Sequence, residues 1–503
     1  MKPYGKSKLW FVIGSQHLYG PEVLKEVENH SNIIAKYLNE SEEIPMTVQY
    51  KSVVKSSKEI SDICLAANAD DDCIGLILWM HTFSPAKMWI QGLNYLNKPF
   101  VHLHTQFNKE LPWSEIDMDF MNLNQAAHGC REFGFMGARL RKERKVVVGH
   151  WQDPEVISQL SSWIRAAAAW ADWQQLKIAR IGDNMRDVAV TEGDKVGAQM
   201  KLGFSCNGYG IRDIVEVIET IKDQEIKDLI DVYYNSYQVA KDIKENNTKE
   251  TSLKEAARIE IALRRFLQEG DFGAFTDTFE NLHGFHQLPG IAVQRLMADG
   301  YGFGAEGDWK TSAMVRALKV MAKGLKGGTS FMEDYTYHLE TGNEKVLGAH
   351  MLEVCPSIAG SKPSLEVHPL SIGGKNDPAR LIFTAPSGAG LCSSIIDLGN
   401  RFRFVTNIID VTQPDEPLPN LPVACAVWKP KPNLKKAASA WITAGGSHHT
   451  CFSQAVTREM IEDFSMISGV ESVIIDDDLD PYRFKQELRW NDIYYHLSNG
   501  LSS

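Results

Sequence analysis

Two acids and two histidines in this sequence are of the types that bind divalent metal ions. Glu306 lies in the segment GFGAEGDW, and Glu333 lies in SFMEDYTYHLE. His350 follows in GAHMLEVCP, and His449 lies much further along the chain in AGGSHHT. Glycine or aromatic residues flank all four, and glycine lets other groups approach closely. Carboxylates and imidazoles together suit a divalent transition metal, so we expect these four side chains to converge on one ion.

The residues alone leave other interpretations of this set open. Each glutamate, taken singly, is also typical of a solvated surface acid, and each histidine of a hydrogen-bonded structural residue. His448 directly precedes His449, and the sequence does not distinguish the two as ligands. The metal site is therefore a hypothesis that needs the fold to bring distant segments together.

The same region contains a pattern that suggests a nucleotide site. Gly302 to Gly307 fits G-x-G-x-x-G, the dinucleotide fingerprint. That fingerprint needs a preceding strand, whereas IAVQRLMADG (291–300) predicts a helix. Glu306 would also place a negative charge where a pyrophosphate binds. We therefore disfavour a nucleotide site here, and we interpret the basic cluster RLRKERK (139–145) as a solvated helix end.

The elements that position these residues begin with an α/β pattern. An apolar run at 8–14 predicts a buried strand, followed by a loop and a helix opened by Pro21. Further strands and helices then alternate to about residue 150. This alternation predicts a doubly wound parallel sheet, whose ligands gather at the carboxyl ends of strands. Gln16, His81 and His104 lie at such ends.

The later segments predict two more domains. Residues 117–142 predict one helix, and a long helix follows Asp153. A second α/β segment starts near 176, with helices expected at 212–224 and at 252–268, the latter opened by a capping box of Ser252 and Glu255. After 330, short β-type runs separated by glycine and proline clusters predict a mainly β domain, a sheet or barrel. We place the domains at 1–175, 176–326 and 327–503.

Composition narrows the classes of protein and partner. The 503 residues carry a net charge of −11, which argues against a general nucleic-acid or anionic-membrane binder. No apolar stretch is long enough for a transmembrane helix, and the first residues show no leader pattern. Eight scattered cysteines without a CxxC pair predict buried thiols in a reducing compartment. We expect a cytoplasmic protein.

Seven segments of the chain match one family of enzymes. They are GSQHLYG (14–20), NLNQAAHG (122–129), GAEGDWKT (304–311), SFMEDYTYHLE (330–340), GAHMLEVCPSI (348–358), GGSHHT (445–450) and LRWNDIYY (488–495). The chain thereby resembles the L-arabinose isomerases over essentially its whole length. The resemblance implies the fucose/arabinose isomerase type of fold: two α/β domains followed by a β-rich, barrel-like domain. It also implies one Mn²⁺ per subunit, held by Glu306, Glu333, His350 and His449.

The resemblance implies an aldose–ketose isomerase. Its reaction would convert L-arabinose to L-ribulose, and also D-galactose to D-tagatose, as the first step of arabinose catabolism. Glu306 and Glu333 would be both metal ligands and the acid/base pair that forms an ene-diol, while the metal would stabilise the developing enolate charge. The residues leave open which glutamate takes the C2 proton, and a metal-assisted hydride shift is a rival mechanism.

The resemblance also implies a sugar pocket and an oligomer. The residues expected to line the pocket are Gln16, Leu18, Tyr19, Gln125, His128, Met185, Phe279 and His448. Because several of these are N-terminal, far in sequence from the ligands, the neighbouring subunit's N-terminal domain would complete the site in a homohexamer or homotetramer. The expected partner is a small aldose.

Two other classes of protein compete with this interpretation. A nucleotide-dependent oxidoreductase would need a glycine fingerprint after the first strand, which GSQHLYG lacks. A non-catalytic sugar-binding protein of the periplasmic kind would carry a secretion signal and would have no use for the pair Glu306 and Glu333.

Overall fold

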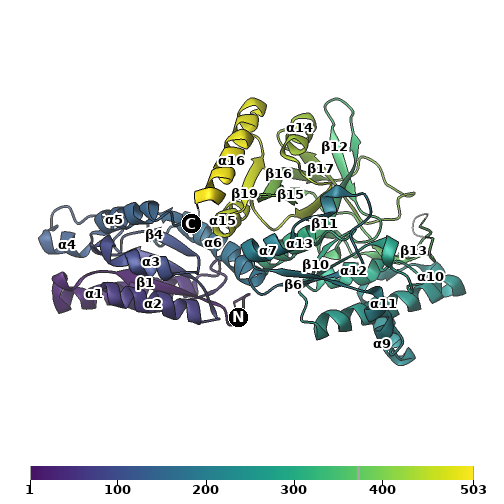
Figure 1. Cartoon of the computed structure of the whole chain (residues 1–503), viewed down its shortest axis with the longest axis horizontal. Helices are drawn as coiled ribbons and strands as arrows, with labels where there is room; N and C mark the ends of the chain where they lie inside the picture. Colours follow the sequence, from purple (N-terminus) through teal and green to yellow (C-terminus); the bar gives the residue numbers. More distant parts are fainter. Residues whose placement is uncertain (1, 371–373, 502–503) are drawn as a thin grey trace. The chain divides into compact units, whose positions relative to one another are not determined.

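The structure is a computed structural model that describes residues 2–370 and 374–501. The chain forms two compact units (Figure 1). The first contains residues 1–171 and 459–469, and the second contains residues 172–458 and 470–503. Among the described residues, no helix combines the length and the apolar character needed to cross a membrane.

The first unit is built on a five-stranded parallel sheet. Its order is β2-β1-β3-β4-β5, the flavodoxin-like order with a switch point between β1 and β3. The strands are β1 (Lys8–Gly14), β2 (Thr47–Val54), β3 (Cys73–Met80), β4 (Phe100–His104) and β5 (Lys145–Val148). Every residue of β3 is buried, as expected for a strand with helices on both faces. The predicted doubly wound sheet is confirmed.

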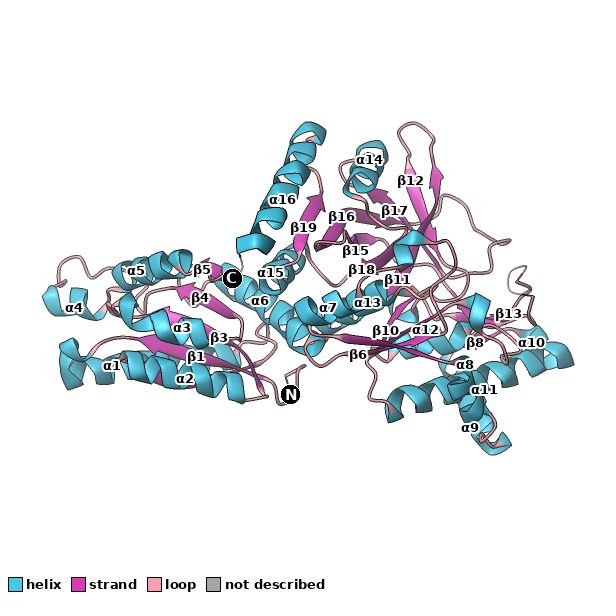
Figure 2. Cartoon of the chain, viewed as in Figure 1, coloured by secondary structure: helices cyan, strands magenta, loops and turns pink. Residues whose placement is uncertain are grey.

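Helices flank this sheet (Figure 2). They are α1 (Gly20–Glu40), α2 (Ser57–Ala69), α3 (Ile90–Tyr95), α4 (Met118–Leu123), α5 (Ala126–Arg139) and α6 (Pro154–Trp173). The single helix predicted at 117–142 is wrong, because the backbone leaves helical geometry at Asn124 and Gln125. Gln125 consequently lies at the start of α5 rather than inside a helix.

A helix from late in the sequence belongs to the first unit. It is α15 (Arg458–Ser468). The ammonium group of Lys145 on β5 donates to Asp463 at 2.7 Å and to Glu459 at 2.8 Å. Ser162 of α6 donates to the same Asp463 oxygen at 2.7 Å. A buried ion pair with these extra hydrogen bonds joins the helix to the sheet.

The second unit begins with a four-stranded parallel sheet in the order β10-β9-β6-β7. Its strands are β6 (Lys177–Ile181), β7 (Ser205–Tyr209), β9 (Ala274–Asp277) and β10 (Gly302–Gly304). Because β7 and β9 lie on opposite sides of β6, the switch point lies between β6 and β9. The middle α/β segment is thus also wound in both directions, as predicted.

The helices of this segment differ from prediction in detail. They are α7 (Lys195–Leu202), α8 (Ile211–Ile218), α9 (Asp223–Ser236), α10 (Lys241–Glu245), α11 (Asn247–Glu269), α12 (Gly290–Ala298) and α13 (Trp309–Met321). The helix predicted at 212–224 is two helices. The capping box of Ser252 and Glu255 is wrong, because both lie inside α11, and Asn246 caps it by accepting from the Thr248 amide at 2.9 Å.

The remaining strands close into a six-stranded antiparallel barrel. The order around it is β15-β18-β11-β12-β17-β16, and β16 pairs back to β15. The strands are β11 (Thr329–His338), β12 (Lys345–Ala349), β15 (Gly388–Asp397), β16 (Phe402–Thr412), β17 (Cys425–Pro430) and β18 (His449–Ser453). β19 (Glu471–Ile475) adds in parallel to β16. The predicted mainly β, barrel-like domain is confirmed.

Smaller elements surround the barrel. A three-stranded sheet contains β8 (Gln238–Val239), β13 (Ser364–Val367) and β14 (Ala379–Ile382). Two helices, α14 (Leu434–Ala444) and α16 (Pro481–Leu501), also belong to this part of the unit. Arg401 holds α16 through Asp492, and it also donates to the buried Glu471 at 2.5 Å.

Candidate active site

Three loops of the middle sheet reach one place. Met185 lies in the loop after β6, Phe279 follows β9, and Glu306 follows β10. In a parallel sheet the carboxyl ends of strands share one edge, and ligands bind there at the switch point. The amide of Met185 donates to the carbonyl of Glu306 at 2.9 Å, which joins two of the loops directly.

Glu306 has an unusual backbone conformation. Its φ is 62°, in the left-handed region, and Gly307 follows with φ 83°. A side chain at Gly307 would lie within 2.6 Å of the backbone of Asn184. Left-handed geometry at a residue other than glycine stores about 1–3 kcal/mol of strain and is concentrated at functional sites. The fold therefore fixes Glu306 at a particular place despite an energetic penalty.

The barrel brings the other three predicted ligands together through its strand register. Glu333 on β11 pairs with Ala349 of β12 on one side and with His449 of β18 on the other. His350 directly follows Ala349. Cross-strand neighbours lie side by side on one face of a sheet. Antiparallel pairing of three strands thus places one carboxylate between two imidazoles.

The ring nitrogens of both histidines point at carboxylates. The Nε2 atom of His350 lies 3.3 Å from Oε1 of Glu333. The Nε2 atom of His449 lies 3.4 Å from the same oxygen and 3.5 Å from Oε2 of Glu306. Potential ligand atoms of Glu306, Glu333 and His350 all lie within 4.8 Å of one another, and the same holds for Glu306, His448 and His449. The four residues predicted to bind a metal therefore do converge.

Two further carboxylates hold the opposite edges of these rings. Nδ1 of His449 lies 3.0 Å from Oδ2 of Asp308, and Nδ1 of His350 pairs with Oε2 of Glu353. Carboxylates in this position orient histidines that bind metals and leave Nε2 for the ion. Neither Asp308 nor Glu353 is among the residues predicted from the sequence. The available signal was an acid two or three residues after a proposed ligand.

Asp308 is itself held firmly. It caps α13 by accepting from the amides of Lys310 at 3.2 Å and Thr311 at 3.3 Å. The buried ammonium of Lys310 lies 3.1 Å from the same oxygen, Oδ1, and the Thr311 hydroxyl donates to Oδ2 at 2.8 Å. Burial alone would raise the pKa of Asp308, but Lys310 and His449 hold it well below its usual range. A fixed negative charge therefore stands behind His449.

The charged groups of the site oppose the effect of burial on one another's pKa values. Burial alone would lower the pKa of His350, but Glu353 and Glu333 raise it to about 10. Burial also disfavours the charged form of His449, yet the nearby carboxylates of Asp308, Glu306 and Glu333 raise its pKa well above the ordinary value. The same imidazoles hold the pKa of Glu333 low against its burial. The site stabilises positive charge between its carboxylates.

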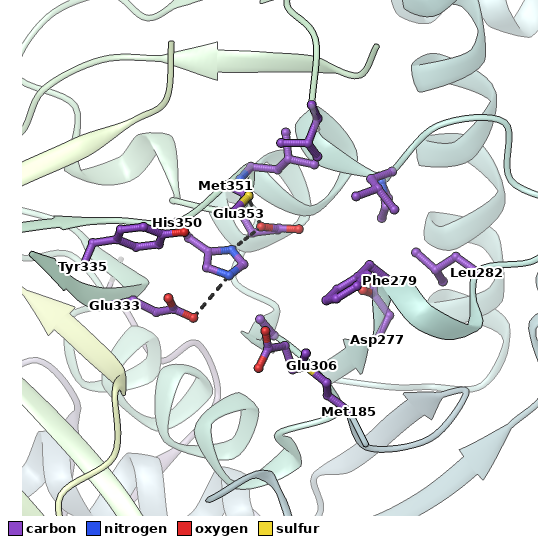
Figure 3. A pocket seen from close by; sticks show the side chains of 15 residues that line it. Met185, Asp277, Phe279, Leu282, Glu306, Glu333, Tyr335, His350, Met351 and Glu353 are labelled. Carbon is purple, nitrogen blue, oxygen red and sulfur yellow. Dashed lines mark hydrogen bonds and ion pairs between the residues drawn. The ribbon is translucent and has the colours of Figure 1, made fainter. Parts of the chain in front are cut away.

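Glu306, Glu333, His350 and Glu353 line a cavity of about 180 Å³ (Figure 3), whereas His449 lies buried behind them. Glu333, His350 and Tyr335 lie at one end, and Phe279, Asp277 and Leu282 lie at the other. Pockets for drug-sized ligands usually measure about 300–1,000 Å³, so this cavity suits a smaller molecule. Met185 and Phe279, both predicted pocket residues, line it.

His448 differs from its neighbour His449. His449 is fully buried, whereas His448 is exposed, with its ring 4.3 Å from that of His449. Burial and the charge of His449 lower the pKa of His448. His449 has the enclosed position and the carboxylate behind it, so we keep it as the expected ligand and His448 as an expected substrate-binding residue.

The five predicted N-terminal pocket residues belong to the first unit. Tyr19 donates to Oε1 of Gln125 at 3.1 Å, and Gln16 donates to the carbonyl of Phe83 at 3.0 Å. The ring of His128 lies 5.1 Å from that of Phe83. Leu18 is 81% exposed. Four of the five therefore cluster around Phe83, near the β1/β3 switch point, and their role in binding stays a prediction.

Family models match almost the whole chain. They are the L-arabinose isomerase N-terminal domain at residues 3–175, the central domain at 177–324 and the C-terminal domain at 328–471. The chain belongs to the L-arabinose isomerase family. This confirms the resemblance carried by the seven motifs and the predicted enzyme class, an aldose–ketose isomerase. Neither the oxidoreductase nor the binding-protein interpretation gains support from this family.

Individual relatives agree with this assignment. An L-arabinose isomerase of Herpetosiphon aurantiacus is 59% identical over 494 residues, which cover 98% of this chain and 99% of the relative. One from Geobacillus stearothermophilus is 58% identical over 495 residues, covering 98% and 99%. One from Flavobacterium johnsoniae is 59% identical over 492 residues, covering 98% of each. The similarity therefore includes every segment that builds the site.

Proposed function

We propose that this protein is a metal-dependent isomerase that converts L-arabinose to L-ribulose. The observation that carries the proposal is the geometry of the two histidines. Each Nε2 atom points at Glu333, and each Nδ1 atom is held by a second carboxylate. Relatives named L-arabinose isomerase that are 56–59% identical to this chain supply the substrate.

The donor atoms fit a divalent ion such as Mn²⁺. The buried Nε2 atom of His449 has no hydrogen-bond partner within the described part of the chain, although two carboxylate oxygens flank it at 3.4 and 3.5 Å. Two carboxylates and two imidazoles form a ligand set of intermediate hardness, which suits this class of metal. Glu306, Glu333, His350 and His449 would hold one Mn²⁺ per subunit. When bound, the ion supplies Lewis-acid stabilisation of the negative charge that develops on the sugar's first two oxygens.

The two glutamates would move the protons. Isomerisation transfers a proton between C2 and C1 and redistributes protons between O1 and O2. Glu306 and Glu333 both line the cavity, and neither is more than partly exposed. The neighbouring imidazoles keep Glu333 ionised and able to accept a proton. Positioned proton transfer of this kind contributes about 10²–10⁴ in rate.

The central test removes the metal and each glutamate in turn. Chelation should abolish conversion of L-arabinose to L-ribulose, and added Mn²⁺ should restore it. Glu306→Ala and Glu333→Ala should each lower turnover by at least about 10². Glu340→Ala, an exposed acid beyond the end of β11, is the matched control and should keep full activity. Near wild-type turnover in either pocket variant would sink the proposal.

An isotope experiment separates the two candidate proton paths. In deuterated water an ene-diol would carry solvent deuterium into C1 of the product. Full retention of the substrate's C2 hydrogen at C1 would instead indicate a hydride shift and would remove the acid/base role of the glutamates. We expect solvent exchange, because two carboxylates face the reacting carbons.

We propose that D-galactose is a second, poorer substrate, giving D-tagatose. It differs from L-arabinose by one CH₂OH group, and the apolar lining residues Leu282, Leu288 and Leu370 offer that hydroxyl no hydrogen-bonding side chain. Arabinose should therefore give the higher kcat/KM, and no tagatose formation at all would exclude the extension. With arabinose as substrate, the enzyme would act in the cytoplasm as the first step of arabinose catabolism.

We also propose a homohexamer or homotetramer in which a neighbouring copy completes the site. The cluster of Gln16, Tyr19 and Gln125 offers hydroxyl-binding groups at the surface of the first unit, beside the exposed Leu18. On α16 the apolar side chains of Trp490, Ile493, Tyr494 and Leu497 are exposed along one helical stripe. Exposed apolar stripes of this kind are typical of interfaces.

Complementation tests the shared site. Glu306→Ala and Gln125→Ala should each be weakly active alone. Copies unfolded, mixed and refolded together should regain activity, because some sites would then combine an intact Glu306 with an intact Gln125 from the neighbour. A mixture no more active than its parts, or a monomer by sedimentation, would contradict the proposal.

A further inference from the structure

Asp277 is a carboxylate of the cavity that has no side-chain hydrogen bond or ion pair among the described residues and no role in the proposed proton transfer. It ends strand β9 and is only 6% exposed. Its carboxyl group lines the cavity, beside Phe279 (Figure 3). Within the described residues, no hydrogen bond to its side chain is formed, although the backbone carbonyl accepts from the amide of Gly307 at 2.9 Å.

Neighbouring polar groups are all engaged elsewhere. The hydroxyl of Thr276 donates to the carbonyl of Gly304 at 2.6 Å. Oε2 of Glu353 pairs with Nδ1 of His350 and accepts from the amide of Leu352 at 3.2 Å. Phe279 and Leu282, which lie beside Asp277 in the cavity, are apolar. Asp277 therefore differs from the acids around it, because the protein itself does not satisfy it.

A buried carboxyl group without hydrogen bonds is unfavourable, and such a group in a native structure calls for an explanation. Packing does not provide one, since an apolar residue would fill the same space without that penalty. A ligand that brings hydroxyl groups into the cavity would provide one. Each hydroxyl carries one donor and two acceptor lone pairs, so it can pair with this carboxyl group in either protonation state.

The position of Asp277 in the cavity indicates which part of a bound sugar would contact it. Glu333 and His350 lie at one end of the cavity, and Asp277 lies at the other, next to Phe279 (Figure 3). A sugar whose first two oxygens face the glutamates extends its remaining hydroxyls towards Phe279. Resting on the proposed function, we propose that Asp277 binds a hydroxyl of the aldose beyond C2 and thereby positions the reacting carbons.

The test compares Asp277→Ala and Asp277→Asn with Asp271→Asn. Asp271 is the matched control, because it precedes the same strand, is exposed, and has left-handed backbone geometry that asparagine adopts readily. Asp277→Ala should raise KM for L-arabinose about tenfold or more and change kcat less, because a hydrogen bond to a charged group is lost. Asp277→Asn keeps the shape and should lose less. Asp271→Asn should match the wild type.

A binding measurement and altered sugars separate a contact from a general loss of structure. Calorimetry should show that Asp277→Ala also binds L-arabinitol, which does not react, more weakly than the wild type does. The affinity for Mn²⁺ alone should stay unchanged. Among the 3-, 4- and 5-deoxy forms of L-arabinose, one should show equal kcat/KM in the wild type and in Asp277→Ala. If Asp277→Ala fails to fold, the same comparisons are made with Asp277→Asn.

The outcomes distinguish this inference from the proposed function. A wild type that does not isomerise L-arabinose would overturn the function itself. An active wild type with unchanged KM and arabinitol affinity in the Asp277 variants would overturn only the role of Asp277. The role would also be overturned if Asp277→Ala lowered kcat/KM by the same factor for all three deoxy sugars as for L-arabinose.

Discussion

His102 in the first unit and His449 in the second are both buried, yet their surroundings have opposite effects. His102 lies on β4 beside Phe133, and neither ring nitrogen has a hydrogen-bond partner among the described residues. Burial, followed by the charges of Arg144 and His104, lowers its pKa to about 3. His449 touches three carboxylates, and its pKa is raised well above the ordinary value.

The neighbouring pairs show the same contrast. His81 is fully buried, stacks on Trp79 at 4.3 Å and pairs with Nδ1 of His30 at 2.8 Å, and burial lowers its pKa to about 3. His30 does contact Glu26, but that acid is half exposed, and burial still lowers the pKa of His30. Among these histidines, a carboxylate therefore outweighs the effect of burial on the imidazole's pKa only where the carboxylate is enclosed as well. Two histidines of the site have such an enclosed carboxylate beside them: His350 has Glu353, and His449 has Asp308.

The largest expected consequence is a loss of stability of the first unit in acid. The folded pKa values of His81 and His102, about 3, lie below the unfolded value of about 6.5. The unfolded chain therefore binds more protons as pH falls below 6.5, and stability decreases. Each histidine should remove about 2 kcal/mol between neutral pH and pH 5, or about 4 kcal/mol together. Hydrogen exchange of strands β3 and β4 at the two pH values measures this loss.

A substitution isolates the contribution of one histidine. His102→Phe removes two unsatisfied nitrogens and keeps a ring, so the part of the acid-induced loss that His102 contributes, about 2 kcal/mol, should disappear. Substitution of a group whose pKa is the same in the folded and unfolded states would not change this slope, because such a group does not affect the proton balance of unfolding. An unchanged pH dependence in His102→Phe would show that His102 does not remain neutral in the folded unit.

The next largest effect concerns the carboxylates behind the pocket histidines. Glu353→Gln removes the charge that orients His350 but keeps the side chain's size. Affinity for Mn²⁺ should fall about 10–100-fold, and turnover at low Mn²⁺ should fall with it. Calorimetric titration of Mn²⁺ measures the change. Asp308→Asn should act similarly through His449, although it also leaves the buried Lys310 without its anion. Unchanged metal affinity in Glu353→Gln would show that the enclosed carboxylate does not prepare His350 as a metal ligand.

Much of the fold could be predicted because local patterns determine it. The apolar run of β3 and the alternation of strands and helices indicate a parallel sheet without any distant contact. Local patterns were weaker at helix ends. The periodicity continues through Asn124, so the break between α4 and α5 was missed, and Ser252 looked like a cap although Asn246 is the cap.

The site was less predictable because it depends on pairing between distant strands. Glu333 and His449 are cross-strand partners across a long stretch of sequence, and their register follows from barrel closure rather than from any local signal. Residue types and family motifs predict both residues as ligands, but they do not predict how the side chains are oriented. Asp308 and Glu353 were overlooked for the same reason. Their task depends on which ring nitrogen they face.

Substitution of Phe331, whose ring contacts both histidines of the site, should have a smaller effect. Phe331 contacts His350 and His449 edge to face, with centroids 5.1 and 5.4 Å apart. Phe331→Leu keeps an apolar side chain but removes this contact, and aromatic pairs contribute about 0.5–1.5 kcal/mol beyond area burial. Turnover should fall by about threefold to tenfold, while Mn²⁺ affinity falls less than in Glu353→Gln. Equal losses in both variants would assign ring orientation to packing rather than to the carboxylate.

The smallest expected effect is that of a carboxylate–histidine pair at the surface. Glu366 accepts from Nε2 of His368 at 2.7 Å, and both side chains are about one-third exposed. Burial would raise the pKa of Glu366, but His368 and Ser364 outweigh burial and lower the pKa. The contribution of this pair to the free energy of unfolding is therefore present at neutral pH and is lost only in acid.

Glu366→Gln is the same chemical change as Glu353→Gln beside another histidine. Because solvent screens this pair, unfolding free energy at pH 7 should change by less than about 1 kcal/mol, with Mn²⁺ affinity and turnover unchanged. A larger loss, measured by urea unfolding, would mean that enclosure is not what makes the pocket carboxylates effective.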